Sequence, residues 1–90
     1  MNFYYLRKKL LYQSMHRGCK ELDILLGNFA KKFLTNLDFH SIIFYKELLD
    51  MQNYEILDLI NQKVIIPKYL NQKVLQQIIL FNNISNDKKI

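Results

Sequence analysis

The stretch MHRGCKELD at residues 15–23 contains the features that separate two predicted helices. Gly18 interrupts the helical pattern, because glycine is a poor helix former and readily adopts turn conformations. Glu21 follows three residues later, where a carboxylate is stabilised by the free N–H groups of a helix start. We therefore predict a turn at this stretch, with Gly18 as the N-cap of the helix that follows.

Hydrophobic periodicity on both sides of this turn predicts five helices. We expect them over residues 3–15, 19–35, 39–51, 54–61 and 72–82. Only two glycines and one proline occur in the chain, and this scarcity of turn residues disfavours a many-stranded sheet. The predicted fold is all-α, a compact five-helix bundle. It forms one helical domain over residues 1–84, followed by a polar and loose tail over residues 85–90.

Polar residues in front of three of these helices are predicted N-caps, namely Asp38, Asn53 and Asn71. Residues 61–69 are predicted to form a loop, although Val64 to Ile66 could form a short strand. The residues expected in the core are Phe3, Leu6, Leu10, Leu11 and Met15; Cys19, Leu22, Leu26, Phe29, Ala30 and Phe33; Ile42, Tyr45, Leu48 and Leu49; Ile56, Leu57 and Ile60; and Val74, Leu75, Ile78 and Phe81. Gly27 lies inside the second helix, where close packing could compensate for its low helix propensity.

The net charge of +5 is concentrated at the N-terminus. The first twenty residues contain five basic residues and no acidic one, whereas the other seventy contain eight of each. Such a segment could bind nucleic acid, an anionic membrane or an acidic protein surface. No apolar run reaches the roughly 18–20 residues needed to cross a bilayer, so we expect no membrane insertion. A small basic helical nucleic-acid-binding protein is the alternative that this composition leaves open.

The sequence contains no recognisable catalytic or metal-binding motif. His16 and His40 are the only histidines and neither lies in an H-E-x-x-H pattern, so no metal site is predicted. The single Cys19 cannot form an internal disulfide, which favours a reducing compartment. No glycine-rich phosphate loop is present. We therefore expect a protein without catalytic residues of its own.

Two interpretations of residues 16–21 remain open on physical grounds. In the first, they form only a turn between helices. In the second, they form a recognition edge, because the planar guanidinium of Arg17 suits a carboxylate or carbonyl and Gly18 lets a partner come close. Physical chemistry alone does not choose between the two.

Residues 12–30, YQSMHRGCKELDILLGNFA, resemble the small succinate dehydrogenase assembly factors, which are the flavinylation factors of bacteria and mitochondria. The similar pattern is Arg17-Gly18, two variable residues, and then Glu21-Leu22-Asp23. The later stretches Leu37-Asp38 and Tyr45-x-x-Leu48-Leu49-Asp50 also fit, so the resemblance covers about residues 10–60. The family commonly has a tryptophan in the fourth helix, but this chain has none, and Leu59 stands at about that place.

The resemblance implies a five-helix bundle that binds the flavoprotein subunit of succinate dehydrogenase, and in some members that of fumarate reductase. It implies that the factor promotes covalent attachment of FAD as a chaperone. The partner carries the FAD, and this chain binds no cofactor stably. No nucleic acid is expected as a partner. Because mitochondrial members need a presequence ahead of the first helix, a bacterial-type cytoplasmic protein is the expectation, and the mitochondrial matrix is the less favoured location.

The resemblance also assigns the contact residues. Arg17 would bind the flavoprotein by charge-assisted hydrogen bonds, and Gly18 would allow close approach. Glu21 would hold Arg17 or the helix start in place. The other predicted flavoprotein-binding residues are His16, Lys20 and Asp23, with Ile24 extending the surface; for Asp23, pairing with a basic residue of the first helix is an open alternative. We predict that Arg17→Ala or Gly18→Arg abolishes flavinylation while the fold survives.

Overall fold

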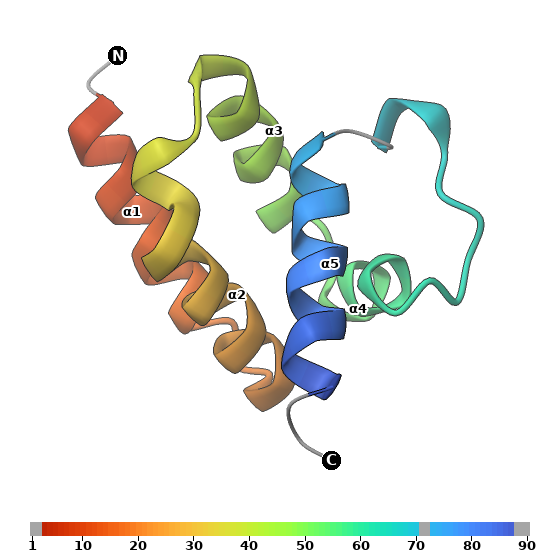
Figure 1. The fold of residues 1–90 in the computed structure, drawn as a ribbon. Helices are drawn as coiled ribbons and strands as arrows, with labels where there is room; N and C mark the ends of the chain where they lie inside the picture. The colour runs from red at the N-terminus through yellow and green to blue at the C-terminus, as the bar shows by residue number, and fades with distance from the viewer. Residues whose placement is uncertain (1–2, 71–72, 88–90) are drawn as a thin grey trace.

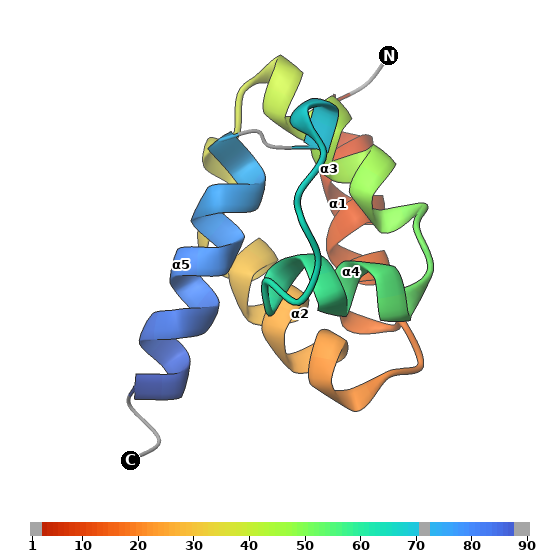
Figure 2. The same ribbon diagram turned by 90° about the vertical axis from the view of Figure 1, so that its right-hand side faces the viewer.

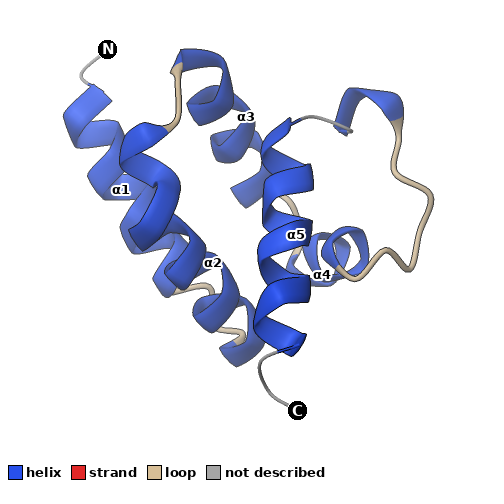
Figure 3. Cartoon of the chain, in the orientation of Figure 1, coloured by secondary structure: helices blue, strands red, loops and turns tan. Residues whose placement is uncertain are grey.

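The computed structural model describes residues 3–70 and 73–87 of this chain. All the regular secondary structure in these residues is helical, and loops join the helices (Figure 3). The five α-helices are α1 (Phe3–Met15), α2 (Lys20–Phe33), α3 (Phe39–Leu49), α4 (Asn53–Ile60) and α5 (Lys73–Asp87). Short 3₁₀ turns follow α2 at Leu34–Asn36 and precede α5 at Lys68–Leu70. The predicted all-α, five-helix fold is confirmed.

The helices pack around one core with α1 and α2 antiparallel and side by side (Figure 1). α3 packs on α1, and α5 contacts α2, α3 and α4. The segment after α4 runs along the outside of the bundle to the start of α5 (Figure 2). The radius of gyration of 12.5 Å is close to the roughly 12 Å expected for a compact domain of this length.

Most of the predicted apolar stripes form this core. In α2, α3 and α5 the buried residues are Leu22, Leu25, Leu26, Phe29, Ala30, Ile42, Phe44, Tyr45, Leu48, Leu49, Val74, Leu75, Ile78 and Ile79. Some predicted core residues are only half-buried, and of these Phe3, Leu11, Cys19, Phe33, Leu57 and Phe81 pack against the core; Met15 is half-buried too. Leu25, Phe44, Leu59 and Ile79 are buried although the stripes did not include them. α4 packs against α5 and buries Ile56, Leu59 and Ile60. A tryptophan at the place of Leu59 would therefore belong to the core.

Gly27 lies at a close approach of α1 and α2. A Cβ atom at Gly27 would lie 3.1 Å from the Cγ atom of Met15, which is tighter than ordinary van der Waals contact. The compensation by close packing that the sequence suggested is present, because glycine lets the end of α1 lie against the middle of α2.

Several predicted helix boundaries need correction. Cys19, not Gly18, is the N-cap of α2, because the cap position takes the extended backbone of Cys19 (φ −127°). Gly18 has φ +78°, a left-handed conformation outside the helix. Asn53 is the first residue of α4 rather than its cap; Gln52 is the cap, and its N–H donates to Glu55 Oε1 over 3.2 Å. The last helix continues to Asp87, so residues 85–87 of the predicted tail are helical.

The predicted cap at Asp38 is confirmed. The backbone N–H of Ser41 donates to Asp38 Oδ1 over 2.9 Å. This hydrogen bond is the main reason that the pKa of Asp38 lies below its usual value. The predicted cap at Asn71 lies outside the described residues. The possible strand at Val64 to Ile66 is absent, and these residues are loop.

A buried polar pair joins α1 to α3. The hydroxyl oxygens of Ser14 and Tyr45 lie 2.6 Å apart, and both residues are fully buried. Ser14 Oγ donates to the carbonyl of Leu10 over 2.7 Å, which leaves the Tyr45 hydroxyl to donate to Ser14. Burial raises the pKa of Tyr45 to about 12, although the hydrogen bond to Ser14 and the charge of Arg17 oppose this effect.

We expect alkaline pH to destabilise the fold through Tyr45. The unfolded chain releases this proton near pH 10, whereas the folded chain holds it to about pH 12. The stabilising contribution is therefore complete below pH 10 and is lost as the pH rises through 12, by roughly 2–3 kcal/mol. Urea unfolding between pH 9 and 12 measures this loss. Tyr45→Phe should show a smaller decline over the same range, and equal declines in both proteins would contradict the assignment.

Candidate functional site

The predicted contact residues lie at the corner where residues 16–19 join α1 to α2, at one end of the bundle (Figure 1). Gly18 is exposed at this corner with φ +78°, a conformation that L-amino acids with side chains rarely adopt. No atom lies within 4 Å of the position where a Cβ of Gly18 would be. The backbone at Gly18 is therefore accessible from outside the chain.

Arg17 clamps this corner to the corner between α3 and α4. Its Nη1 donates to the carbonyl of Leu49, and its Nη2 donates to the carbonyl of Met51 over 2.8 Å. Its Nε donates to Asn53 Oδ1 over 2.9 Å. In return, Asn53 Nδ2 donates to the carbonyl of Arg17 over 3.3 Å.

The clamp stabilises the end of α3, which lies at Leu49, two residues earlier than predicted. The last carbonyls of an α-helix have no partner within the helix, and a cation near them is stabilised by the helix dipole. The guanidinium of Arg17 supplies both donors and charge at the end of α3, where the helix stops at Leu49. The side chain of Arg17 thus links the α1–α2 corner to the end of α3, more than thirty residues away in the sequence.

Asp23 fixes the same corner from the other side. Its Oδ1 accepts a hydrogen bond of 2.6 Å from the backbone N–H of Arg17. The alternative in which Asp23 pairs with a basic side chain of the first helix is therefore wrong, because its carboxylate binds main chain instead. Of the two roles predicted for Glu21, the structure favours the second: within the described residues no ion pair joins Glu21 to Arg17, whereas Glu21 lies in the first turn of α2, where its charge suits the helix start.

His16 lies next to Arg17 and stacks on the ring of Tyr12. The two rings stack with centroids 4.0 Å apart, and His16 Nδ1 lies 2.8 Å from the carbonyl of Tyr12. Both rings are exposed. A polar cavity of about 260 Å³ opens here, lined by Tyr12, Gln13, His16, Arg17, Leu49 and Asn53. This cavity presents a ring face and amide groups to a partner.

The outer face of the first two turns of α2 completes the site. Lys20 and Glu21 are exposed, and Ile24 is 53% exposed although it is a large apolar residue. The structure thus brings His16, Gly18, Lys20 and Glu21 together on one exposed edge, which we call the corner surface. Arg17 and Asp23 lie behind it as its internal supports.

Sequence reasoning missed Asn53, Tyr12 and the carbonyl groups of α3 as members of this site. Tyr12 could have been found, because residues four apart on a helix are neighbours and His16 directly follows α1. Nothing in the sequence pairs position 17 with position 53. The amide of Asn53 was available for Arg17 because Gln52 took over the cap of α4.

Two other kinds of feature, a metal-ligand cluster and a membrane-spanning helix, are absent from residues 3–70 and 73–87. Histidine, cysteine and carboxylate side chains do not gather there in a group of three or more that could hold a metal ion. None of the described helices has the length and apolar character needed to cross a membrane.

A family model described as "Flavinator of succinate dehydrogenase" matches residues 8–82. A mitochondrial succinate dehydrogenase assembly factor 2 from Dictyostelium discoideum is 39% identical over 71 residues, which are 79% of this chain and 50% of that protein. The protein of the same name from Schizosaccharomyces japonicus is 34% identical over 74 residues, covering 81% of this chain and 52% of that protein. The chain spans about half the length of these relatives. No solved structure matches significantly.

These comparisons correct the expected location. The prediction of a bacterial cytoplasmic protein is wrong, because relatives such as those from Dictyostelium discoideum and Schizosaccharomyces japonicus are named mitochondrial. That prediction rested on how soon the first helix begins, and the position of a helix in a chain carries no information about its compartment.

Proposed function

The chain belongs to the family of the flavinator of succinate dehydrogenase, and we propose on this basis that it is an assembly factor for the flavoprotein subunit of that enzyme. In this proposal it binds the flavoprotein and promotes covalent attachment of FAD to it. The protein acts in mitochondria, as the names of its relatives suggest. It is not itself a catalyst, because the covalent chemistry belongs to the flavoprotein and its flavin, and it holds no FAD stably.

The observation that carries this proposal is the corner surface. The matched residues 8–82 include the whole corner, which is exposed and yet rigidly supported. A preformed surface loses little conformational entropy on binding, so its contacts contribute more fully to affinity. Gly18 lets the main chain of the flavoprotein approach, while His16, Lys20 and Glu21 offer polar contacts around it.

Arg17 has a different role here from the one the resemblance implied. Three of its five N–H groups already donate within the chain, so it positions the corner surface more than it binds the partner. Arg17 also lines the polar cavity beside His16. A direct hydrogen bond from Arg17 to the flavoprotein remains a prediction.

We expect flavinylation in cells to depend on this chain. Cells that lack it should show little in-gel flavin fluorescence from the denatured flavoprotein subunit, and the wild-type chain should restore the signal. Immunoblotting of the flavoprotein subunit controls for its abundance. We extend the proposal to the flavoprotein of fumarate reductase, which the same gel measures where that enzyme is present. Equal fluorescence with and without the chain would show that flavinylation does not need it.

A further inference from the structure

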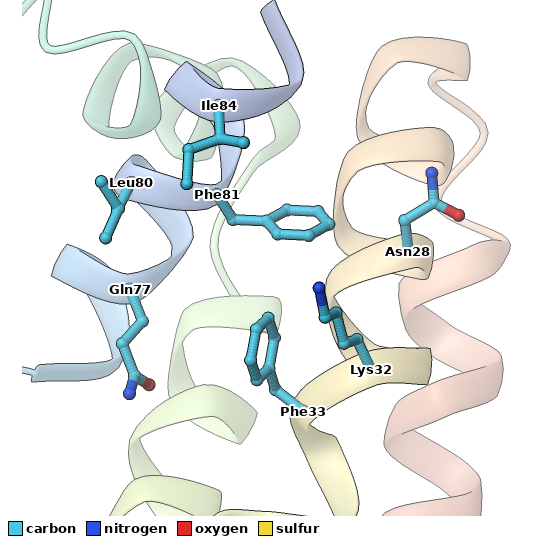
Figure 4. A pocket seen from close by; sticks show the side chains of 7 residues that line it. All are labelled: Asn28, Lys32, Phe33, Gln77, Leu80, Phe81 and Ile84. Carbon is cyan, nitrogen blue, oxygen red and sulfur yellow. The ribbon is translucent and has the colours of Figure 1, made fainter. Parts of the chain in front are cut away.

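We propose that the groove between α2 and α5 is a second contact for the flavoprotein, and that it receives an apolar segment carrying an acidic residue. This inference rests on the proposed function. The groove has a volume of about 550 Å³ and is lined by Asn28, Lys32, Phe33, Gln77, Leu80, Phe81 and Ile84 (Figure 4). It lies apart from the cavity beside Arg17, which other residues line.

The floor of this groove is aromatic and firm. The rings of Phe33 and Phe81 point toward each other from the two helices, with centroids 5.9 Å apart and planes at 90° (Figure 4). Phe29 is fully buried behind them, with its ring 5.1 Å from Phe33 and 5.9 Å from Phe81. Because the floor rings pack on the core, the groove is formed before a partner arrives.

The wall of the groove on α5 leaves large apolar side chains in water. Leu80 is 60% exposed, and Ile84, one turn further along α5, is also exposed. A partner that covers these exposed apolar residues and the aromatic floor beside them would remove apolar surface from water. This burial would stabilise the complex.

The charge at the groove selects for an acidic partner segment. Lys32 is the charged residue among its described lining residues, and its ammonium lies 5.6 Å from the centroid of the Phe33 ring. No carboxylate of the described part of the chain lines the groove or pairs with Lys32. A carboxylate of the partner that reached Lys32 over this apolar floor would be partly desolvated, which strengthens the attraction.

The groove is connected to the corner surface along the exposed side of α2. Lys20, Ile24, Asn28 and Lys32 are spaced four residues apart and are all exposed. Each step of four residues turns by about 40° around the helix axis, so this row crosses the exposed side of α2 diagonally while it rises about 18 Å from Lys20 to Lys32. A partner bound at the corner surface therefore meets a continuous strip that leads to Lys32. For this reason we assign the groove to the flavoprotein rather than to a second copy or a small molecule.

The affinity of the full chain for the isolated flavoprotein subunit tests the groove. Leu80→Gln removes exposed apolar surface without disturbing the core, and we expect roughly tenfold weaker binding. Lys32→Glu should weaken binding about five- to tenfold, with a smaller loss at high salt. The matched controls are Ile65→Gln, since Ile65 is 95% exposed on the loop after α4, and Lys63→Glu, since Lys63 is an exposed cation on the same loop. Both should bind like the wild type.

The possible outcomes separate this inference from the proposed function. If the wild type does not bind the flavoprotein at all, the proposed function fails and the groove inference fails with it. If the wild type binds and Gly18→Arg does not, while Leu80→Gln and Lys32→Glu bind normally, only the groove inference is overturned. Controls as weak as the groove variants would overturn it too. So would a wild-type dimer in sedimentation that Leu80→Gln dissociates, because a second copy would then occupy the groove.

Discussion

Arg17→Ala is expected to lower the free energy of unfolding by about 3 kcal/mol. The substitution removes the donors to the carbonyls of Leu49 and Met51 and to the amide of Asn53. Hydrogen bonds from a charged donor contribute about 1.5–3 kcal/mol each, and orphaned partners add to the cost, although these terms are not additive. Small domains have only about 5–15 kcal/mol of stability, so the loss is large. Urea unfolding followed by circular dichroism measures it.

Two further variants test the geometry of the clamp. Arg17→Lys retains the charge but not the planar fork, so it should recover only a minor part of the stability. Lys20→Ala is the matched surface control, because Lys20 is an exposed cation three residues away and should change stability by less than about 0.5 kcal/mol. If Arg17→Ala unfolded like the wild type, the guanidinium would not be structural, and it would be free for a partner.

This result would change how Arg17 variants are interpreted in cells. The resemblance predicted that Arg17→Ala abolishes flavinylation while the fold survives. The clamp leads us to expect that flavinylation falls with Arg17→Ala because less folded protein is present. Growth at lower temperature or higher expression should then restore part of the flavin signal. A fully folded but inactive Arg17→Ala protein would instead support direct contact.

Gly18→Arg is expected to abolish flavinylation with only a modest loss of stability. The left-handed φ of Gly18 costs a residue with a Cβ about 1–2 kcal/mol, but no atom obstructs the new side chain within 4 Å of its Cβ. The fold should survive, while a long cation occupies the space that a bound flavoprotein needs. In-gel flavin fluorescence at equal protein levels, together with thermal unfolding, measures both effects.

Gly18→Ala and Gly18→Asn are the controls for this substitution. Alanine imposes the backbone cost with little bulk, and asparagine tolerates the left-handed region better than most residues. Both should retain most of the flavinylation activity. Full activity of Gly18→Arg would show that the corner surface does not face the flavoprotein. Equal loss in all three variants would mean that backbone conformation, not steric access, explains the effect.

The helices of this protein could be predicted because their signals are local. Apolar residues at 3.6-residue spacing indicated all five helices, and the cap at Asp38 needed only the backbone three residues ahead. The cap predictions that were wrong are those where two neighbouring residues could each serve as the cap. Gly18 and Cys19 compete for one boundary, where Gly18 takes a left-handed φ and Cys19 the cap; Asn53 and Gln52 compete for another, where Asn53 is bound by Arg17 and Gln52 pairs with Glu55.

The candidate site was predicted only in part. Its position at residues 16–24 followed from the Arg-Gly pattern and its resemblance to a known family, and the exposure of Gly18, Lys20 and Ile24 agrees with it. The sequence did not reveal that Ser14 and Tyr45 form a buried pair. Serine is usually exposed, so nothing in the sequence predicts that Ser14 is buried until its hydrogen-bond partner is known.

By itself, the sequence determined the fold class, the order of the helices, and the corner that separates α1 from α2. These properties depend on backbone preferences and on apolar periodicity, both of which act over a few residues. Only the tertiary structure decided that Arg17 is a clamp and that α2 and α5 enclose a groove. Both arise where helices distant in sequence pack together, and the packing decides which polar groups lose water and must find partners inside the chain.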